Sequence, residues 1–295
     1  MIHFSRSGLV PERDAVPSAG HPIGPGALGL GLRREFLQQI LETPGHGVDF
    51  FELAPENWIG FGGRPAARLR ALTEKHPFIC HGLSLSIGGP APLDMDLLKA
   101  IQDFMAIHGM RHYSEHLAYC ADHGQLYDLL PLPFTEEMVL HLARRIRRVQ
   151  DFLQKPLIVE NTAYYGGFHH STLTELEFLL AVLEEADCLL LLDLNNLHVN
   201  SANHHYDATD FLRALPAGRI AYQHIAGYAR HPQGWLIDTH DAAVDTPVWD
   251  LLRLSTDLFG SLPTLLEWDN QIPPLPQLLG ELLGARQSRP VRGTH

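Results

Sequence analysis

Cysteine is scarce in this chain of 295 residues, which has only Cys80, Cys120 and Cys188. The number is odd, the spacing is wide and there is no Cys-x-x-Cys pair, so we expect neither a disulfide framework nor a zinc knuckle. Long apolar runs are also missing. No window of about 18 apolar residues occurs, and residues 1–19 lack the continuous apolar segment of a signal peptide. The sequence therefore predicts a soluble, cytoplasmic protein that does not associate with a membrane.

Basic residues are too few to balance the acidic ones. Lys and Arg total 22 against 34 Asp and Glu, which gives a formal net charge of −12. Because a surface that follows phosphates needs excess positive charge, we do not expect nucleic acid as a partner. Lysine is rarest, with Lys75, Lys99 and Lys155 all on predicted helices or turns. Histidine, in contrast, occurs 19 times, often at the ends of predicted strands, and this distribution favours metal ligation.

Short apolar segments alternate with amphipathic segments along most of the chain. The predicted strands are 27–32, 48–53, 77–82, 112–118, 156–161, 188–193, 219–224 and 263–270. The predicted helices are 33–43, 64–75, 93–108, 135–154, 171–186, 207–215, 246–258 and 275–286. Eight such units without a linker predict an α/β fold, a single TIM (β/α)8 barrel over residues 27–286, with a doubly wound sheet as the alternative.

The ends of the chain differ from this pattern. Residues 1–26 contain several Pro and Gly residues and are predicted to form an irregular N-terminal arm. Residues 287–295 are polar and are predicted to be a disordered tail.

The stretch from Cys188 to His205 combines an apolar run with a cluster of polar side chains. Its length favours a strand buried on both faces, which ends at Asp193 and is followed by Asn196 and His198. Burying an isolated carboxylate costs several kcal/mol, so Asp193 needs a cation or several hydrogen-bond donors. Taken alone, the stretch fits an Asx turn with a structural histidine equally well.

Similar polar residues lie at or just beyond the ends of successive predicted strands: His81, His116, Glu160, Asp193, His224, Asp238, His240 and Glu267. A closed barrel would bring them together at the carboxyl ends of its strands. Four acids and four imidazoles in one volume require cations, and oxygen with nitrogen donors suits iron, manganese or zinc better than calcium or magnesium. Eight ligands exceed the needs of one ion, which predicts two or three metals about 3.5–4 Å apart.

Two further features receive no binding role. The Gly-rich segment 84–90 does not have the spacing of a phosphate-binding loop. The basic face of the helix predicted at 135–154 is interpreted as a solvated surface stabilised by Glu136 and Glu137 in its first turn.

The polar residues occur within longer blocks: Glu56-Asn-Trp58, His81-Gly-Leu-Ser-Leu-Ser-Ile-Gly-Gly89, Ser114-Glu-His-Leu117, Glu160-Asn161, Leu192-Asp-Leu-Asn-Asn-Leu-His-Val-Asn200, His224-Ile-Ala-Gly227, Asp238-Thr-His240 and Glu267-Trp-Asp-Asn-Gln-Ile-Pro273. From about Leu28 to Gln277 the sequence resembles the DUF692 (UPF0276) family of multinuclear non-heme iron-dependent oxidative enzymes, which includes methanobactin-biosynthesis oxidases.

The resemblance implies a xylose isomerase-like TIM barrel with two or three irons in mixed Fe2+ and Fe3+ states, and O2 as co-substrate. The implied ligands fall into three groups: His81, His116 and Glu160 on the first iron; Glu160 as a bridge, with Asp193, His224 and Glu267, on the second; and Asn196, Asp238 and His240 near the third. Glu56 and His198 become candidates for proton transfer, and Asp238 for a catalytic role beside metal binding.

The resemblance also implies the substrate, a ribosomally made precursor peptide whose cysteine residues are oxidised, often with a small partner protein that recognises the peptide. Two alternatives remain open from the residues. The same ligands with zinc or manganese would suit a hydrolase or a sugar isomerase of the endonuclease IV or xylose isomerase-like type, although the negative charge and scarce lysine weigh against both. The other alternative is a peptide-binding scaffold that uses iron only for structure.

Overall fold

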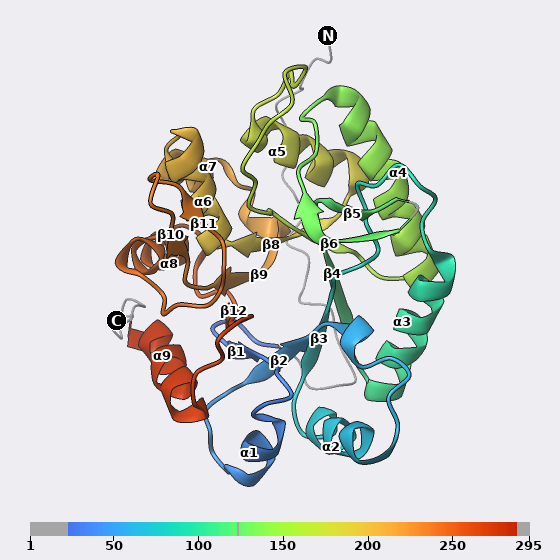
Figure 1. Cartoon of the computed structure of the whole chain (residues 1–295), viewed down its shortest axis with the longest axis vertical. Helices are drawn as coiled ribbons and strands as arrows, with labels where there is room; N and C mark the ends of the chain where they lie inside the picture. Colours follow the sequence, from blue (N-terminus) through green and yellow to red (C-terminus); the bar gives the residue numbers. More distant parts are fainter. Residues whose placement is uncertain (1–22, 123, 288–295) are drawn as a thin grey trace.

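The computed structural model describes residues 23–122 and 124–287. Eight parallel strands close into a barrel in the order β1-β12-β9-β8-β7-β4-β3-β2, and helices surround it (Figure 1). The predicted TIM barrel is therefore confirmed. Residues 1–22 of the predicted arm and 288–295 of the predicted tail lie outside the described residues. Gln287, which was assigned to the tail, is the last residue of a helix.

The barrel strands are short and almost entirely buried, because the helices cover their outer faces. They are β1 (Leu28–Gly31), β2 (Phe50–Leu53), β3 (Phe78–Gly82), β4 (His112–His116), β7 (Ile158–Glu160), β8 (Leu189–Asp193), β9 (Ile220–Ile225) and β12 (Thr264–Leu266). The helices are α1 (Leu37–Glu42), α2 (Gly63–Thr73), α3 (Met95–His108), α4 (Glu136–Leu153), α5 (Glu175–Ala186), α6 (Leu194–His204), α7 (Ala208–Ala214), α8 (Thr246–Phe259) and α9 (Leu275–Gln287), with 3-10 turns η1 (Pro55–Asn57) and η2 (Ala217–Arg219).

A small apolar layer fills the barrel interior separately from the larger core between strands and helices. Its buried members are Phe50, Ile79, Ile158, Leu191, Tyr222 and Leu265. Each stands two residues before an acid or imidazole of its strand region, and residues two apart share a face of a strand. The polar counterparts are Glu52, His81, Glu160, Asp193, His224 and Glu267. The barrel therefore carries a layer of potential ligands directly above an apolar layer, at the carboxyl ends of the strands.

Two β-hairpins extend the barrel at this end. The β5 (Tyr119–Ala121) and β6 (Gln125–Leu130) hairpin follows β4, and the β10 (Ala229–Arg230) and β11 (Leu236–Ile237) hairpin follows β9. Neither hairpin is predicted from the sequence, and α6 is not predicted either. No helix among the described residues is long and apolar enough to cross a membrane.

The residues that cap α4 and α5 show that local sequence predicted the start of α4 but not the start of α5. Thr135 accepts a hydrogen bond from Met138 N and caps α4 close to its predicted start. Thr174, rather than the predicted Ser171, caps α5 in a capping box with Glu177.

The basic face of α4 is not wholly a solvated surface, which corrects the prediction for this helix. Arg145 donates hydrogen bonds to the carbonyl oxygens of Ser86, Ile87 and Ala91, at 2.6 to 3.0 Å. These contacts hold the Gly-rich segment that follows β3 against α4.

Candidate metal centre

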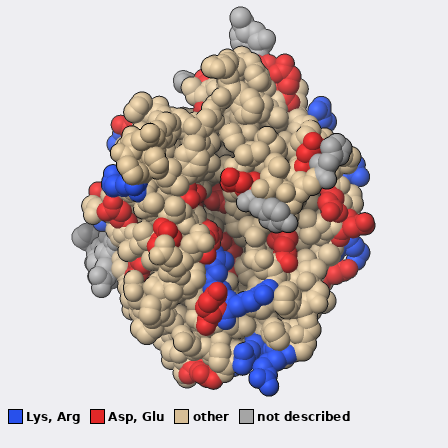
Figure 2. All heavy atoms as spheres, in the orientation of Figure 1, with Lys and Arg blue, Asp and Glu red and all other residues tan. Residues whose placement is uncertain are grey.

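A cavity of about 450 Å3 opens at the carboxyl ends of the barrel strands. Figure 2 shows acidic side chains gathered in this hollow, with basic side chains along its lower edge. Its lining includes His81, His116, Glu160, Asp238 and His240. The cavity therefore joins residues that are far apart in the sequence, such as His81 and His240, which are 159 positions apart.

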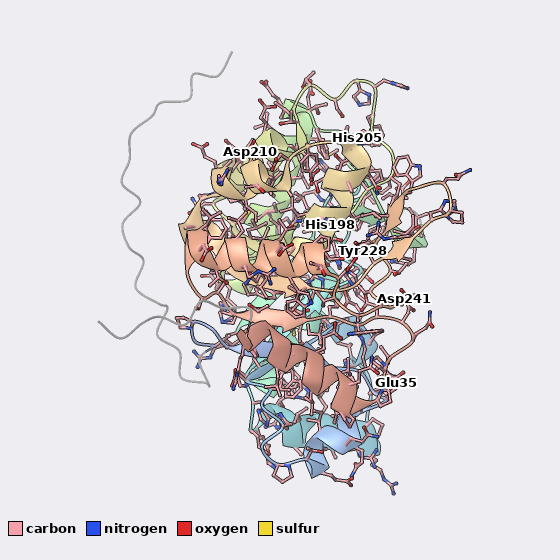
Figure 3. All side chains as sticks on the ribbon, turned by 90° about the vertical axis from the view of Figure 1, so that its left-hand side faces the viewer. Glu35, His198, His205, Asp210, Tyr228 and Asp241 are labelled. Atoms are coloured by element: carbon pink, nitrogen blue, oxygen red, sulfur yellow. The ribbon has the colours of Figure 1, made fainter. Side chains whose placement is uncertain are left out.

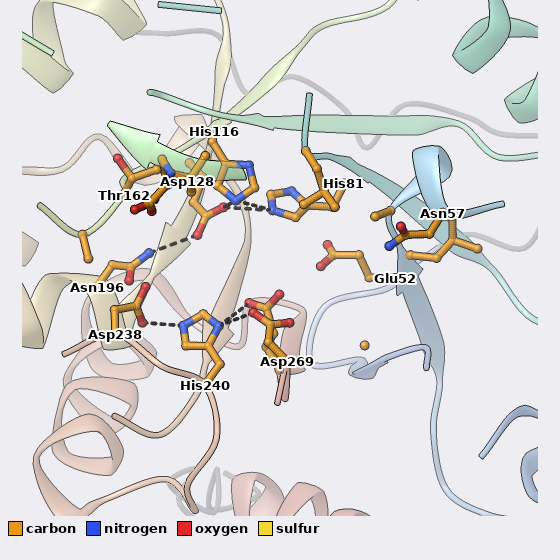
Figure 4. Close-up of a pocket in the computed structure, with 18 of the residues that line it drawn as sticks. Glu52, Asn57, His81, His116, Asp128, Thr162, Asn196, Asp238, His240 and Asp269 are labelled. Atoms are coloured by element: carbon orange, nitrogen blue, oxygen red, sulfur yellow. Dashed lines mark hydrogen bonds and ion pairs between the residues drawn. The ribbon is translucent and has the colours of Figure 1, made fainter. Parts of the chain in front are cut away.

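One group of ligand atoms comes from three neighbouring strands, β3, β4 and β7. His81 Nε2 lies 3.0 Å from Glu160 Oε2, and His116 Nε2 lies 3.4 Å from the same oxygen. The two imidazole nitrogens are 3.1 Å apart. Figure 4 shows the rings of His81 and His116 turned toward each other. Three ligand atoms thus converge, as the first implied iron site requires.

A second group surrounds His224 of β9, which is fully buried. Its Nε2 lies 3.0 Å from Glu52 Oε1, and its Nδ1 lies 3.0 Å from Glu267 Oε2 and 3.6 Å from Asp193 Oδ2. Glu160 belongs to this neighbourhood too, because one ligand atom each from Glu160, Asp193 and His224 lie within 4.8 Å of one another. Both Glu160 and Asp193 can therefore connect two groups, as bridging carboxylates do.

A third group forms around His240, in the segment that follows the β10–β11 hairpin. His240 Nε2 lies 2.6 Å from Asp238 Oδ1, and its Nδ1 lies 3.4 Å from Glu267 Oε2 and 3.1 Å from Asp269 Oδ2. A ligand atom of Asp193 also lies within reach of His240 and Glu267. The backbone of His240 has a positive φ of 46°. Non-glycine residues seldom adopt that conformation, so the fold holds this imidazole at a cost in backbone strain.

Asn196 is brought to the centre by the first turn of α6. Asp193 caps this helix, since its Oδ1 accepts a hydrogen bond from Asn196 N at 2.6 Å. Asn196 Nδ2 donates to Glu160 Oε1 at 3.2 Å and to the carbonyl oxygen of Asn161 at 3.1 Å. The side-chain oxygen of Asn196 and the second oxygen of Asp193 make no hydrogen bond, and Asp193 Oδ2 lies 3.6 Å from His224 Nδ1.

The donor set fits metal ions by a test that does not depend on the resemblance. Eight buried side-chain atoms among the described residues make no hydrogen bond, and three of them, Glu56 Oε2, Asn195 Oδ1 and His198 Nε2, belong to no ligand group. The other five lie at the centre, close to other polar atoms: Glu160 Oε2, Asp193 Oδ2, Asn196 Oδ1, His224 Nδ1 and His240 Nε2. Buried polar atoms without partners are rare in folded proteins. Coordination to cations would satisfy all five, and the mixture of oxygen and nitrogen suits iron, manganese or zinc.

The imidazoles of the first group have unequal affinities for protons. Burial lowers the pKa of His81, but the charges of Glu52 and Glu160 outweigh burial and raise it to about 9. Burial and the nearby charge of His81 hold the pKa of His116 well below its usual range. His116 is therefore the more readily available as a neutral ligand.

The carboxylates are affected in opposite directions. Burial raises the pKa of Glu160 to about 7, although His81 opposes this shift. Burial would also raise the pKa of Glu267, but the charges of His224 and His240 hold it well below its usual range. Without cations these groups compete for shared protons, and metal binding would release those protons.

Two of the three predicted catalytic residues do not line the cavity. Glu56 lies in η1, where its Oε1 accepts hydrogen bonds from Leu83 N and Ser84 N at 2.8 and 3.0 Å. His198 lies in α6 with its ring 5.0 Å from that of Tyr228, on the flank of the barrel (Figure 3). His198 is two residues after Asn196, about 200° farther around the helix, so it faces away from the ligand groups. Asp238 does line the cavity.

Glu52 is the main site residue that the sequence analysis missed. It is 3% exposed, and the other three residues of β2 are buried with it. The sequence does contain a pattern that could have identified Glu52. This acid interrupts an apolar strand two residues after Phe50, just as recognised strand ligands such as His81 follow an apolar residue two positions before them. Glu52 is the penultimate residue of β2, as His81 is of β3, so its position along the strand matches that of a recognised ligand.

The fold and the site define a TIM-barrel protein with clustered candidate metal ligands. Solved structures of similar fold include a D-allulose 3-epimerase from Methylomonas sp., with a TM-score of 0.59 at 13% identity over 91% of this chain and 99% of the other. A xylose isomerase domain-containing protein from Salmonella typhimurium gives the same TM-score and identity, over 91% and 98% of the two chains. At such low identity these two structures support the fold alone.

Sequence comparison identifies the family. The chain belongs to the family described as RiPP precursor modification enzyme MbnB/TglH/ChrH, which matches residues 27–289. RiPP denotes a ribosomally synthesised and post-translationally modified peptide. A UPF0276 protein of Shewanella sediminis is 51% identical over 86% of this chain and 91% of its own length. A UPF0276 protein of Pseudomonas aeruginosa is 54% identical over 86% of this chain and 89% of its own length. The DUF692 (UPF0276) resemblance is thus confirmed, and membership indicates an enzyme that modifies precursor peptides.

Proposed function

We propose that this protein is a multinuclear non-heme iron enzyme that uses O2 to oxidise cysteine residues of a ribosomally synthesised precursor peptide. The observation that carries the proposal is the sharing of ligands between adjacent groups. Glu160, Asp193, His224 and Glu267 each belong to two of the groups of three ligand atoms that lie within 4.8 Å. Three of these four are carboxylates, and carboxylates that two ions can share are what a cluster of two or three neighbouring metals needs.

Iron is proposed because it supplies one-electron redox chemistry and a binding position for O2, which zinc does not. The protein's own part is to hold the ions and admit the peptide. The cavity is open, and Leu83 and Tyr165 line it with partly exposed apolar surface, 39% and 44% exposed. These side chains could contact residues that flank the reacting cysteine. A small partner protein that presents the peptide remains part of the proposal.

Asp238 is the residue that we assign to proton transfer. It lines the cavity, and its Oδ1 accepts a hydrogen bond from Asn195 Nδ2 at 2.7 Å. Burial raises the pKa of Asp238, although His240 opposes the shift. A carboxyl group in that position can hold a proton at Oδ close to a bound peptide. Glu56, by contrast, is assigned to holding the backbone of the segment that follows His81.

The first test is metal content together with turnover. Protein purified under low oxygen without added metal is analysed for metals, and an iron-57 sample is examined by Mössbauer spectroscopy. We expect two or three irons per chain with antiferromagnetically coupled signals. The iron-loaded protein, given O2 and a cysteine-containing precursor peptide encoded by a neighbouring gene, should change the peptide mass. Asp238→Asn should still bind the peptide but lose at least tenfold in turnover.

Asp241→Asn is the matched control for that variant. Asp241 lies in the same segment and accepts a hydrogen bond from Gln271 at 3.0 Å, but it does not line the cavity. It should retain turnover. Zinc or manganese near stoichiometry, with iron absent even after anaerobic reconstitution, would contradict the oxidase and favour the hydrolase or isomerase. Iron binding without peptide turnover would favour the scaffold.

A further inference from the structure

A row of buried hydrogen bonds runs beneath the ligand groups from one side of the barrel to the other. His81 Nδ1 lies 2.8 Å from Ser114 Oγ, which lies 2.8 Å from the hydroxyl of Tyr222. Tyr222 in turn donates to Glu52 Oε2 at 2.6 Å, and Glu52 Oε1 lies 3.0 Å from His224 Nε2. All five residues are no more than 5% exposed. The row therefore joins the first ligand group to the second through Ser114 and Tyr222, which do not line the cavity.

The direction of these hydrogen bonds follows from the number of protons available. Tyr222 has one hydroxyl proton, which it donates to the carboxylate of Glu52, so its oxygen must accept from Ser114. Ser114 also has one proton, and its Oγ lies 2.8 Å from the hydroxyl of Tyr222 and 3.3 Å from the carbonyl oxygen of Cys80. Given to the nearer Tyr222, this proton leaves the Ser114 oxygen to accept from His81 Nδ1. His81 is then protonated at Nδ1. In the neutral ring, Nε2, which faces Glu160 and His116, then carries the lone pair that a metal ion requires, and a metal ion that binds there displaces any second proton.

The same row orients Glu52. The hydroxyl of Tyr222 holds Oε2, which lies 3.3 Å from His224 Nε2, and Oε1 lies 3.0 Å from the same nitrogen, so the carboxylate faces His224 and the second ligand group. Glu52 and Tyr222 are 170 positions apart, and Ser114 and Tyr222 are 108 positions apart, so only closure of the barrel creates the row. Neither Ser114 nor Tyr222 lines the cavity or belongs to a ligand group. Neither can therefore be explained by contact with substrate.

We propose that Ser114 and Tyr222 are positioning residues that set the metal-binding faces of His81 and Glu52 and thereby couple the first two ligand groups. The inference rests on the proposed metal centre but not on the identity of the metal or of the peptide. It also assigns Glu52 to the second group, as a ligand held in place by Tyr222. Hydrogen-bond partners of metal ligands commonly affect metal affinity by about 10- to 100-fold.

The test compares two buried tyrosines on barrel strands. Tyr222→Phe removes the hydroxyl that holds Glu52 and keeps the ring within the apolar layer. Tyr113→Phe is the control, because Tyr113 is fully buried and donates to Glu115 Oε1 at 3.1 Å, and Glu115 belongs to no candidate ligand group. Both full-length variants are prepared without metal and titrated anaerobically with Fe2+. Bound metal is counted after each addition, and Mössbauer spectra are recorded with iron-57.

We expect Tyr222→Phe to weaken the second binding event by about 10- to 100-fold and to reduce the coupled Mössbauer signal, while Tyr113→Phe resembles the wild type. Ser114→Ala should weaken the first event instead, because His81 loses the partner that fixes its tautomer. Ser255→Ala is its control, since this fully buried serine donates to Gln223 away from the ligands. Thermal unfolding of the metal-free variants checks that each pair is equally folded.

Two results would overturn the proposal. One is binding by Tyr222→Phe with wild-type affinity and stoichiometry. The other is an equal loss in Tyr222→Phe and Tyr113→Phe, which would indicate a general effect of removing a buried hydroxyl. If the wild type takes up zinc or manganese but no iron, the oxidase proposal fails by itself, and the same titration with the preferred metal still decides whether the row positions the ligands.

Discussion

Carboxylates that are buried or half-buried occur in two different settings among the described residues. Glu160, Asp193 and Glu267 lie among imidazoles, where metal ions can compensate their charge. Glu175 lies apart from these groups, in the first turn of α5. It accepts hydrogen bonds from Asn200 Nδ2 and from the hydroxyl of Tyr206, both at 3.0 Å. Burial raises the pKa of Glu175 to about 7 despite these donors. This residue therefore offers a pH-dependent contribution to stability that metal binding does not supply.

The sign of that contribution follows from the shift in pKa. Because the folded chain holds the proton of Glu175 more tightly than the unfolded chain, unfolding becomes easier as pH rises from about 4.5 to about 7. Glu175→Gln is always neutral, so the stability of the wild type relative to this variant should fall over that range. Thermal unfolding of metal-loaded wild type and variant at pH 5.5, 6.5 and 8 measures the difference.

Glu177→Gln on the same helix is the control. Glu177 is exposed and forms the capping box with Thr174, and its backbone and side-chain hydrogen bonds lower its pKa. It is ionised throughout the tested range, so its replacement should cost the same at each pH. A constant difference between the wild type and Glu175→Gln across the range would show that burial does not raise the pKa of Glu175.

At the level of elements, the segment that carries His240 depends on a close backbone contact. A Cβ atom added to Gly227, just after β9, would lie 2.0 Å from the carbonyl oxygen of Ala242. The carbonyl oxygen of Gly227 also accepts a hydrogen bond from His240 N at 3.1 Å. Only glycine permits both contacts. This glycine, rather than a ligand, sets the distance between the barrel and the segment that holds Asp238 and His240.

Gly227→Ala should push that segment outward and separate His240 from Glu267, while the groups around His81 and His224 remain. We expect metal analysis to give about one ion fewer per chain, or at least a tenfold weaker last binding event. Gly218→Ala is the control, because nothing lies within 4 Å of a Cβ at that position. Unchanged stoichiometry and affinity in Gly227→Ala would show that the segment tolerates the shift.

At the level of the whole molecule, the ligand layer is a source of instability that metal binding would remove. Glu52, Glu160, Asp193 and Glu267 are all buried within one end of the barrel. Like charges in a low-dielectric interior oppose folding unless cations or protons neutralise them. The barrel should therefore be markedly less stable without its metals than with them.

A chelator should accordingly lower the unfolding temperature, and refilling should restore it. Metal at a hundred times its dissociation constant adds about 2.7 kcal/mol to the unfolding free energy for one site. Scanning calorimetry of metal-free and reconstituted protein measures the effect. Glu160→Gln, which removes a shared carboxylate, should gain less from added metal than the wild type. Equal unfolding temperatures with and without metal would argue against a buried multinuclear centre.

Much of this architecture could be predicted because the information is local. Alternating apolar and amphipathic segments predict eight strand and helix units, and a parallel barrel gathers the carboxyl ends of its strands whatever the details of packing. Polar residues at those ends, such as His81, Glu160 and Glu267, could therefore be recognised as a group. The helix α6 could not be predicted in this way, because an Asp followed by amides and a histidine suggests a ligand loop as readily as a helix cap.

The tertiary structure alone decided which of these polar residues meet and what holds them. His198 lies in the same motif as Asn196, but the turn of α6 directs it to the flank of the barrel. Glu52 lies 172 positions from His224, and no periodicity within the sequence relates the two. Their contact exists because the barrel closes and brings β2 opposite β9. Thus the sequence by itself determined the fold and most of the candidate ligands, whereas closure of the barrel determined their grouping and the buried hydrogen bonds that orient them.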